Sequence, residues 1–161
     1  MKRQFNHACG AVALLLISGL WGCARIDAVS SSLMSSKIEA VAVVNDQILR
    51  GDLQLYPDRT GNVTLDADKA DDKGFITSCM GRLRFTGTSA GAIDLRCNSG
   101  VATELVFTKL SDISGFAYGQ SGSGAVSFVF GLDDEQAKSY LRAPPLKTLV
   151  LRPADGVLDL Q

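Results

Sequence analysis

The stretch GRLRFTGTSAGAIDLRC, residues 81–97, decides the fold of this chain. Its two ends alternate apolar and mostly polar residues, the pattern of a strand with one buried face. Five residues rich in Gly, Thr and Ser, at 86–90, separate the two alternating runs. A gap of that length suits a hairpin loop. The stretch therefore predicts a β-hairpin.

The same pattern occurs twice more. Residues 51–67 read GDLQLYPDRTGNVTLDA, and residues 114–130 read SGFAYGQSGSGAVSFVF. Their five-residue loops are expected at 56–60 and 119–123. Three such units at near-constant spacing predict an all-β fold, a repeated hairpin meander that forms a sandwich or a small barrel.

Further elements are expected between and after the hairpins. Residues 39–44 and 101–110 are strand candidates, and residues 146–151 are expected to close the sheet. Residues 133–141 predict one short C-terminal helix, since Asp stands at its first two positions and two prolines follow it. The buried stripe of this helix should consist of Ala137, Tyr140 and Leu141.

The N-terminal segment carries a different kind of pattern. Lys2 and Arg3 precede an apolar run over residues 11–20, and small Gly22 stands directly before Cys23. This arrangement resembles the signal peptide and lipobox of bacterial lipoproteins. The resemblance implies that residues 1–22 are removed and that Cys23 becomes the lipid-carrying first residue.

Two alternatives remain for this segment: an ordinary cleaved signal peptide and a retained membrane helix. Trp21 departs from the lipobox pattern, where a small or aliphatic residue is usual. All three interpretations place the rest of the chain outside the cytoplasm. The lipoprotein resemblance implies, from Ala24 after the cysteine, sorting to the outer membrane rather than retention at the inner one, and we expect the anchor on its periplasmic face. Residues 23–36, with five serines, predict a lipidated cysteine and a flexible tether, and residues 37–161 a single β-rich domain.

Removal of residues 1–22 would leave 14 basic and 17 acidic residues, a formal charge of −3. A mildly acidic chain has no general attraction for phosphate backbones, so we expect no nucleic-acid partner. The only histidine, His7, lies in the removed segment. We therefore expect no metal site and no cofactor. The acidic run at 66–72 is expected to be a solvated connection rather than a calcium loop.

The remaining cysteines, Cys79 and Cys97, are expected to form a disulfide in an oxidising compartment. If Leu83 faces Ile93 across the second hairpin, the two cysteines lie directly opposite on the inward face. A metal pair or a catalytic dithiol is the alternative, without the C-x-x-C spacing that such sites favour. The chain-entropy model gives a crosslink around such a loop about 3 kcal/mol of stabilisation.

Several residues at or beside hairpin tips could contact a partner. Tyr56 and Arg59 lie in the first loop, and Arg59 belongs to a Pro-Asp-Arg-Thr tip. Arg82, Arg84 and Arg96 are expected on the outward face of the second hairpin, as a basic stripe for an acidic protein surface or for lipopolysaccharide phosphates. The alternative for this stripe is an ordinary solvated strand face.

Phe116 and Tyr118 are aromatic candidates in the third hairpin, and the repeat places both on its inward face, in the core. The chain offers no mature Ser-His pair and no Ser-x-x-Lys motif for nucleophilic catalysis.

Three function classes follow from these patterns. The first is a membrane-anchored, non-enzymatic binding or structural module of the cell envelope, with an envelope protein as partner. The second is a periplasmic inhibitor of an attacking enzyme of the protease or lysozyme type, for which Arg59 would be the key side chain. The third is a hydrolase with a carboxylate or Ser/Lys site. The sequence leaves the oligomeric state open.

Overall fold

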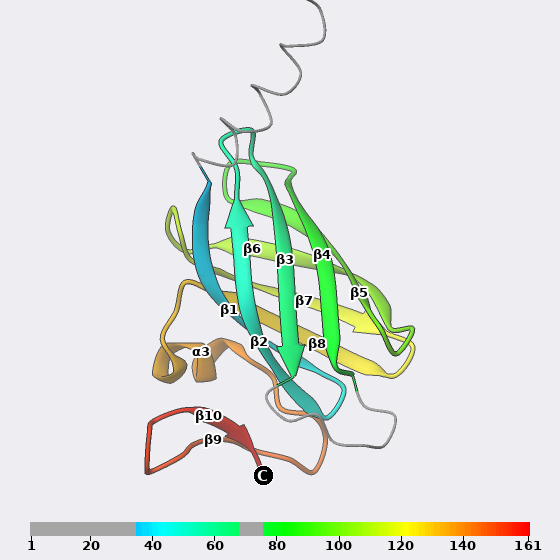
Figure 1. Ribbon diagram of the computed structural model, residues 1–161, viewed down its shortest axis with the longest axis vertical. Helices are drawn as coiled ribbons and strands as arrows, with labels where there is room; N and C mark the ends of the chain where they lie inside the picture. The colour runs from blue at the N-terminus through cyan, green and yellow to red at the C-terminus, as the bar shows by residue number, and fades with distance from the viewer. Residues whose placement is uncertain (1–34, 68–75) are drawn as a thin grey trace, which may run out of the picture. The chain divides into compact units, whose positions relative to one another are not determined.

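Eight antiparallel strands follow one another in sequence order and close into a barrel (Figure 1). The computed structural model describes residues 35–67 and 76–161. Residues 36–161 form one compact unit. The strands of the barrel are β1 Ser36–Val44, β2 Gln47–Leu55, β3 Thr60–Ala67, β4 Ser78–Phe85, β5 Ala90–Cys97, β6 Ala102–Lys109, β7 Gly115–Ser121 and β8 Gly124–Phe130.

The barrel is closed by its first and last strands. β1 pairs antiparallel with β8, from Ala40 opposite Phe130 to Val44 opposite Val126. Closure removes the unpaired sheet edges that a sandwich would have to protect. The expectation that residues 146–151 close the sheet is therefore wrong. Part of that segment forms β9, Leu149–Leu151, which pairs only with β10, Leu158–Leu160, in a separate two-stranded sheet.

The first two hairpins have the predicted register. Leu83 lies opposite Ile93, and Cys79 lies opposite Cys97. In the first hairpin Leu49 lies opposite Ala67, the equivalent pair of the repeat. Both turns occupy the predicted gaps, at 56–59 and 86–89.

The third hairpin differs from the other two. Ser121 pairs with Gly124, so the expected five-residue loop is a two-residue turn. Strand β7 extends through Ser121 into the expected loop, whereas β8 begins at Gly124 as expected, and the pairing shifts so that Phe116 lies opposite Val129.

The expectation that the side chains of Phe116 and Tyr118 face the barrel interior is wrong. In β7 it is Ala117 that is buried in the barrel core, while the two aromatic residues face outward. Because side chains alternate along a strand, one face of β7 carries the small residues and the other the aromatic ones. The inward face also holds Gly115, where an added Cβ would stand 2.7 Å from the ring of Phe130. Small residues of β7 therefore leave room for the large rings of β6 and β8.

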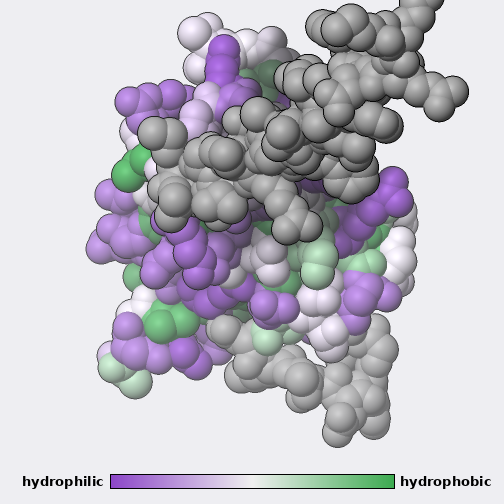
Figure 2. Space-filling model, turned by 45° about the horizontal axis from the view of Figure 1, so that its top comes forward, coloured by the Kyte–Doolittle hydropathy of each residue, from purple (hydrophilic) through white to green (hydrophobic). Residues whose placement is uncertain are grey.

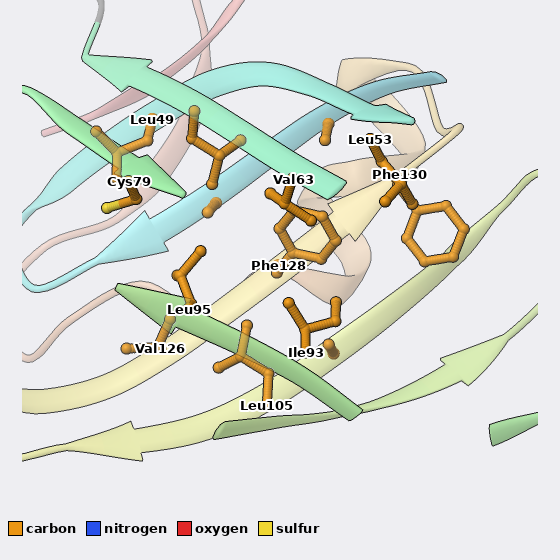
Figure 3. Packing of buried hydrophobic residues seen from close by; sticks show 14 of the residues in the cluster. Leu49, Leu53, Val63, Cys79, Ile93, Leu95, Leu105, Val126, Phe128 and Phe130 are labelled. Carbon is orange, nitrogen blue, oxygen red and sulfur yellow. The ribbon is translucent and has the colours of Figure 1, made fainter. Parts of the chain in front are cut away.

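Apolar side chains from all eight strands fill the barrel interior (Figure 3). Phe107 is fully buried and meets the ring of Phe85 edge-on, with centroids 5.0 Å apart. A second edge-on contact joins Phe107 to Phe130 at 6.3 Å. Phe107 also lies over Gly91 of the neighbouring strand, where a Cβ would come within 2.1 Å of the ring.

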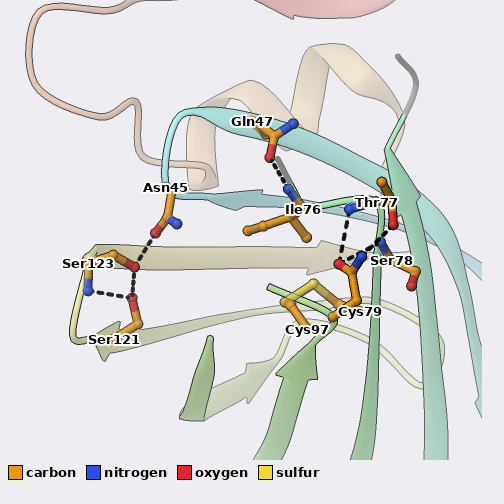
Figure 4. The surroundings of a disulfide bond; sticks show 10 residues. Asn45, Gln47, Ile76, Thr77, Ser78, Cys79, Cys97, Ser121 and Ser123 are labelled. Carbon is orange, nitrogen blue, oxygen red and sulfur yellow. Dashed lines mark hydrogen bonds between the residues drawn. A yellow bond between two sulfur atoms is a disulfide. The ribbon is translucent and has the colours of Figure 1, made fainter. Parts of the chain in front are cut away.

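The disulfide between Cys79 and Cys97 joins β4 to β5 at one end of the barrel (Figure 4). Asn98 follows it and accepts a hydrogen bond from the backbone N–H of Thr77, at 3.1 Å. At the same end Ser123 donates to the side chain of Asn45. The covalent bond is therefore surrounded by side-chain hydrogen bonds that join neighbouring turns.

The C-terminal segment covers the outer side of the barrel at β1, β7 and β8. Helix α3, Asp134–Tyr140, is capped by the side chain of Asp133, as the sequence predicts. Its buried Ala137 and Leu141 and its half-buried Tyr140 pack with β9 and β10 on outward side chains of the barrel. The ring of Phe116 stacks on Tyr140, with centroids 4.9 Å apart. The apolar face of this segment is thus used within the protein.

A partly buried ion pair fastens this cover to the barrel. The guanidinium of Arg50 on β2 donates to both carboxylate oxygens of Asp134, at 3.0 and 2.9 Å. Arg50 also donates to the carbonyl of Leu158, whose N–H donates back to Asp134 at 2.8 Å. Three elements, β2, α3 and β10, therefore meet at one carboxylate.

Replacing Asp134 with Asn is expected to lower the free energy of unfolding by about 2 kcal/mol at neutral pH, because the charged hydrogen bonds are lost. Burial alone would raise the pKa of Asp134, but the bonds from Arg50 and Leu158 and the charge of Arg50 hold this pKa below its ordinary value. The stabilisation is therefore present above the unfolded pKa of about 3.9 and is lost as the pH falls through the lower folded pKa.

Urea unfolding of both proteins at pH 7 and in a series down to pH 3 checks this expectation. The difference between wild type and Asp134→Asn should shrink as the pH falls below about 4. Asp52→Asn is the matched control, since the pair between Lys37 and Asp52 is exposed. An equal loss in the control would contradict a special role for Asp134.

Candidate functional site

The outer surface of β3 to β6 carries a hollow lined by described residues. It is a groove of about 960 Å³ that crosses the four strands on the side away from the barrel core. The space is open to solvent. We call it the outer groove; its lining residues are Asn62, Val63, Thr64, Met80, Gly81, Arg82, Asp94, Leu95, Arg96, Ala102, Thr103 and Glu104.

Strand alternation explains which side chains line the outer groove. In β4, Leu83 is buried in the barrel, so its neighbours Arg82 and Arg84 face solvent. In β5, buried Leu95 leaves Asp94 and Arg96 on the outer face. The three arginines are therefore outward, as predicted. On the side of the molecule that Figure 2 shows, hydrophilic residues predominate and hydrophobic ones form small separate patches.

The three arginines are not equivalent. Arg84 forms ion pairs with Asp94 and, at 3.2 Å, with Glu104 on the next strand. Its charge is thereby used within the sheet, and the two carboxylates share one cation. From the sequence, Arg84 could not be told apart from the other two arginines. Its partner on β6, Glu104, can be identified only once the register of β5 and β6 is known.

The side chains of Arg82 and Arg96 make no hydrogen bond or ion pair with any residue at 35–67 or 76–161. Arg82 stands opposite Asp94, and Arg96 lies two residues further along β5. The two arginines are therefore diagonal neighbours on one face, about 7–8 Å apart, and somewhat closer at their Cβ atoms. Two guanidinium groups at this spacing can bind the same acidic group or two adjacent ones.

An exposed apolar side chain lies beside this pair. Met80 is 66% exposed and stands directly opposite Arg96. Ala102 is the neighbour of Arg96 on the other side. The outer groove thus offers two arginines next to a flexible thioether, a combination typical of adaptable protein contacts. Met80 was not among the sequence candidates; its place two residues before Arg82 on a predicted strand is the signal that could have revealed it.

The side chains of the first hairpin tip are held by contacts within the barrel, and Tyr56 reaches the edge of the outer groove through Asn62, which stands opposite Arg82. The hydroxyl of Tyr56 donates to Gln54 at 3.1 Å and accepts from Asn62 at 3.0 Å. Arg59 donates to the carbonyl of Gly87, and its guanidinium lies 5.0 Å from the ring centre of Phe85. Arg59 therefore joins two turns of the barrel and covers an aromatic ring, instead of projecting as a free side chain.

In the outer groove the carboxylates of Asp94 and Glu104 are both held by Arg84. The described ranges contain no group of three potential metal ligands. Residue 67 ends the described part of the acidic run, so the calcium-loop alternative lies largely outside the described residues. No helix in the described part is long and apolar enough to cross a membrane.

Cys23, Gly22 and the tether up to residue 34 also lie outside the described residues, whereas Ser36, at the end of the expected tether, begins β1. Comparisons of the chain with protein-family models, with curated proteins and with solved structures give no match. The features of this chain that bear on its function are therefore the residues of the outer groove and the N-terminal pattern.

Proposed function

We propose that this protein is a lipid-anchored lipoprotein of the bacterial cell envelope, and that its barrel is a non-enzymatic binding module. The proposed anchor is Cys23, on the periplasmic face of the outer membrane, supported by the lipobox-like residues before it. The proposed binding surface is the outer groove, and the proposed partner is an acidic surface of an envelope protein.

The observation that carries the proposal is the pair of Arg82 and Arg96. The chain as a whole has a formal charge of −1. Against this background two adjacent arginines lack partners among the described residues, beside an exposed methionine. An acidic surface with an apolar residue at its centre would pair both guanidinium groups and cover Met80.

Two further observations favour an outer-surface binding module. The barrel interior is packed with apolar side chains, so a ligand would have to bind outside it. Arg59, the key residue of the inhibitor alternative, is held against Gly87 and Phe85. An inhibitory tip would instead need that guanidinium free to enter an enzyme pocket.

The anchor is tested by the intact mass of the full chain purified from membranes. Loss of residues 1–22 together with a lipid-sized addition on Cys23 is the expected result. A mass that retains residues 1–22 without lipid would overturn the anchor.

The binding surface is tested by photocrosslinking in cells, with a photoreactive amino acid in place of Met80. We expect a crosslinked protein whose amount falls at least about fivefold when Arg82→Glu and Arg96→Glu are combined, because two attractive charges become repulsive. Lys138→Glu, an exposed charge reversal on α3, is the control and should leave the product unchanged.

Two outcomes would overturn this assignment. One is a protein crosslink that is insensitive to the double reversal, since the arginines then contribute nothing. The other is a product with the mass of lipopolysaccharide, which would make lipid phosphates the ligand of the groove. Far-UV circular dichroism of the double variant verifies that the barrel is intact.

A further inference from the structure

The turn between β6 and β7 exposes two large apolar side chains. Leu110 is 45% exposed and Ile113 is 57% exposed. They flank Ser111 and Asp112 in a short connection at the end of the barrel opposite the disulfide. Exposed apolar residues at a loop tip are a feature of surfaces that meet another apolar phase.

This turn is held in one conformation. The N–H of Leu110 donates to the carbonyl of Ser114 at 2.9 Å, and the hydroxyls of Ser111 and Ser114 are 2.6 Å apart. Lys109 pairs with Asp112 at 2.6 Å, so the two charges of the tip offset each other. The backbone of the turn is therefore held by hydrogen bonds, and the turn carries no net charge beside its two apolar side chains.

The turn also lies beside the start of β1. Gly131 has a φ of +64°, and a Cβ there would come within 1.9 Å of the carbonyl oxygen of Ile113. The N–H of the same glycine donates to the carbonyl of Glu39 at 2.9 Å. One glycine thus packs the turn against the first residues of β1, at the end of the barrel where the chain from Cys23 joins it.

We propose that Leu110 and Ile113 insert into the lipid surface to which the protein is anchored. The proposal rests on the lipid anchor at Cys23 given above. Residues 24–35 are the only link between that anchor and β1, and 12 residues span at most about 40 Å. The end of the barrel that carries the turn therefore stays within that distance of the bilayer, so its two apolar side chains can reach the headgroup region.

This orientation leaves the outer groove accessible. Met80 and Arg96 stand next to Cys79 and Cys97, at the end of the barrel remote from the turn. With the turn on the bilayer, these groove residues point into the periplasm. The barrel can then bind a lipid surface at one end and a protein at its side at the same time.

The test uses tryptophan fluorescence of the full lipidated chain in vesicles of phosphatidylethanolamine and phosphatidylglycerol, with and without brominated acyl chains. Ile113→Trp and Leu110→Trp should each lose about half of their fluorescence in the brominated vesicles, because bromine quenches only within the membrane. Met80→Trp, 66% exposed on the remote face, is the matched control and should change little. The unsubstituted protein gives the baseline, and circular dichroism verifies the fold.

The outcomes separate the two proposals. Lipid on Cys23 with no quenching at either position overturns the inserted turn and leaves the anchor in place. No lipid on Cys23, read from the intact mass, overturns the anchor and with it this inference. Equal quenching of Met80→Trp would also overturn the orientation, since the remote face would then lie on the bilayer.

Discussion

Replacing Phe107 with alanine is expected to lower the free energy of unfolding by about 3–5 kcal/mol, the largest effect of any single substitution discussed. The ring is fully buried and makes edge-on contacts with Phe85 and Phe130. Its neighbour across the sheet is Gly91, which has no side chain to move into the space. The cavity therefore stays open, and the cost lies near the upper end for such substitutions.

Urea unfolding followed by circular dichroism measures this effect. Val106→Thr is the control: it keeps a β-branched side chain at the preceding position, which is 64% exposed, and should stay within about 0.5 kcal/mol of wild type. Phe107→Leu provides a milder test, with an expected loss of about 1–2 kcal/mol, in case the alanine variant does not fold. A loss below about 1 kcal/mol for alanine would mean that the barrel collapses around the missing ring.

Breaking the disulfide is expected to cost about 3 kcal/mol, because the unfolded chain regains the freedom of an 18-residue separation. Reduction of the wild-type protein isolates the bond itself, since both sulfur atoms stay in the core. The double variant Cys79→Ala with Cys97→Ala removes the sulfurs as well and should be slightly less stable than the reduced protein.

The comparison is made by urea unfolding with and without reductant, with free thiols counted in each sample. The double variant should not respond to reductant, which controls for effects of the reagent. An unchanged midpoint for the fully reduced wild-type protein would show that the hydrogen bonds around Asn98 and Asn45 hold this end without the crosslink.

Much of the barrel could be predicted because it is encoded locally. A strand with one buried face alternates, and a pair of alternating runs around a short gap has few arrangements, so Leu83 could be placed opposite Ile93 and Cys79 opposite Cys97. The short helix was equally local, since Asp133 caps it as the sequence indicates.

What could not be predicted depends on contacts between distant segments. The repeat places Phe116 inward, but the rings of Phe107, Phe128 and Phe130 already fill the barrel, and α3 offers the aromatic residue a second apolar surface. Alternation along one strand cannot indicate which of two apolar layers a residue joins. Closure by β1 and β8 was missed for the same reason, since these strands are neighbours only in space.

In the candidate site, too, some features could be predicted from the sequence and others could not. The outward face of Arg82, Arg84 and Arg96 followed from the pattern, whereas the ion pairs that set Arg84 apart depend on the register of β6. The exposed Leu110 and Ile113 carried no sequence signal, because apolar residues at the end of a strand usually continue into the core.

The pairing of β1 with β8 also determines the order in which the barrel can fold. β1 ends at Val44 and β8 begins at Gly124, so this strand pair joins segments about 80 residues apart. Every other pair in the barrel joins strands that are consecutive in the sequence. Hairpins form quickly, but a distant pairing must first overcome the entropy of closing a long loop. During synthesis, β1 emerges before the rest of the barrel and stays unpaired on one side until β8 arrives. Its second half, Val41–Val44, is buried on both faces in the finished barrel, so this waiting strand is the part of the chain most in need of protection from other chains.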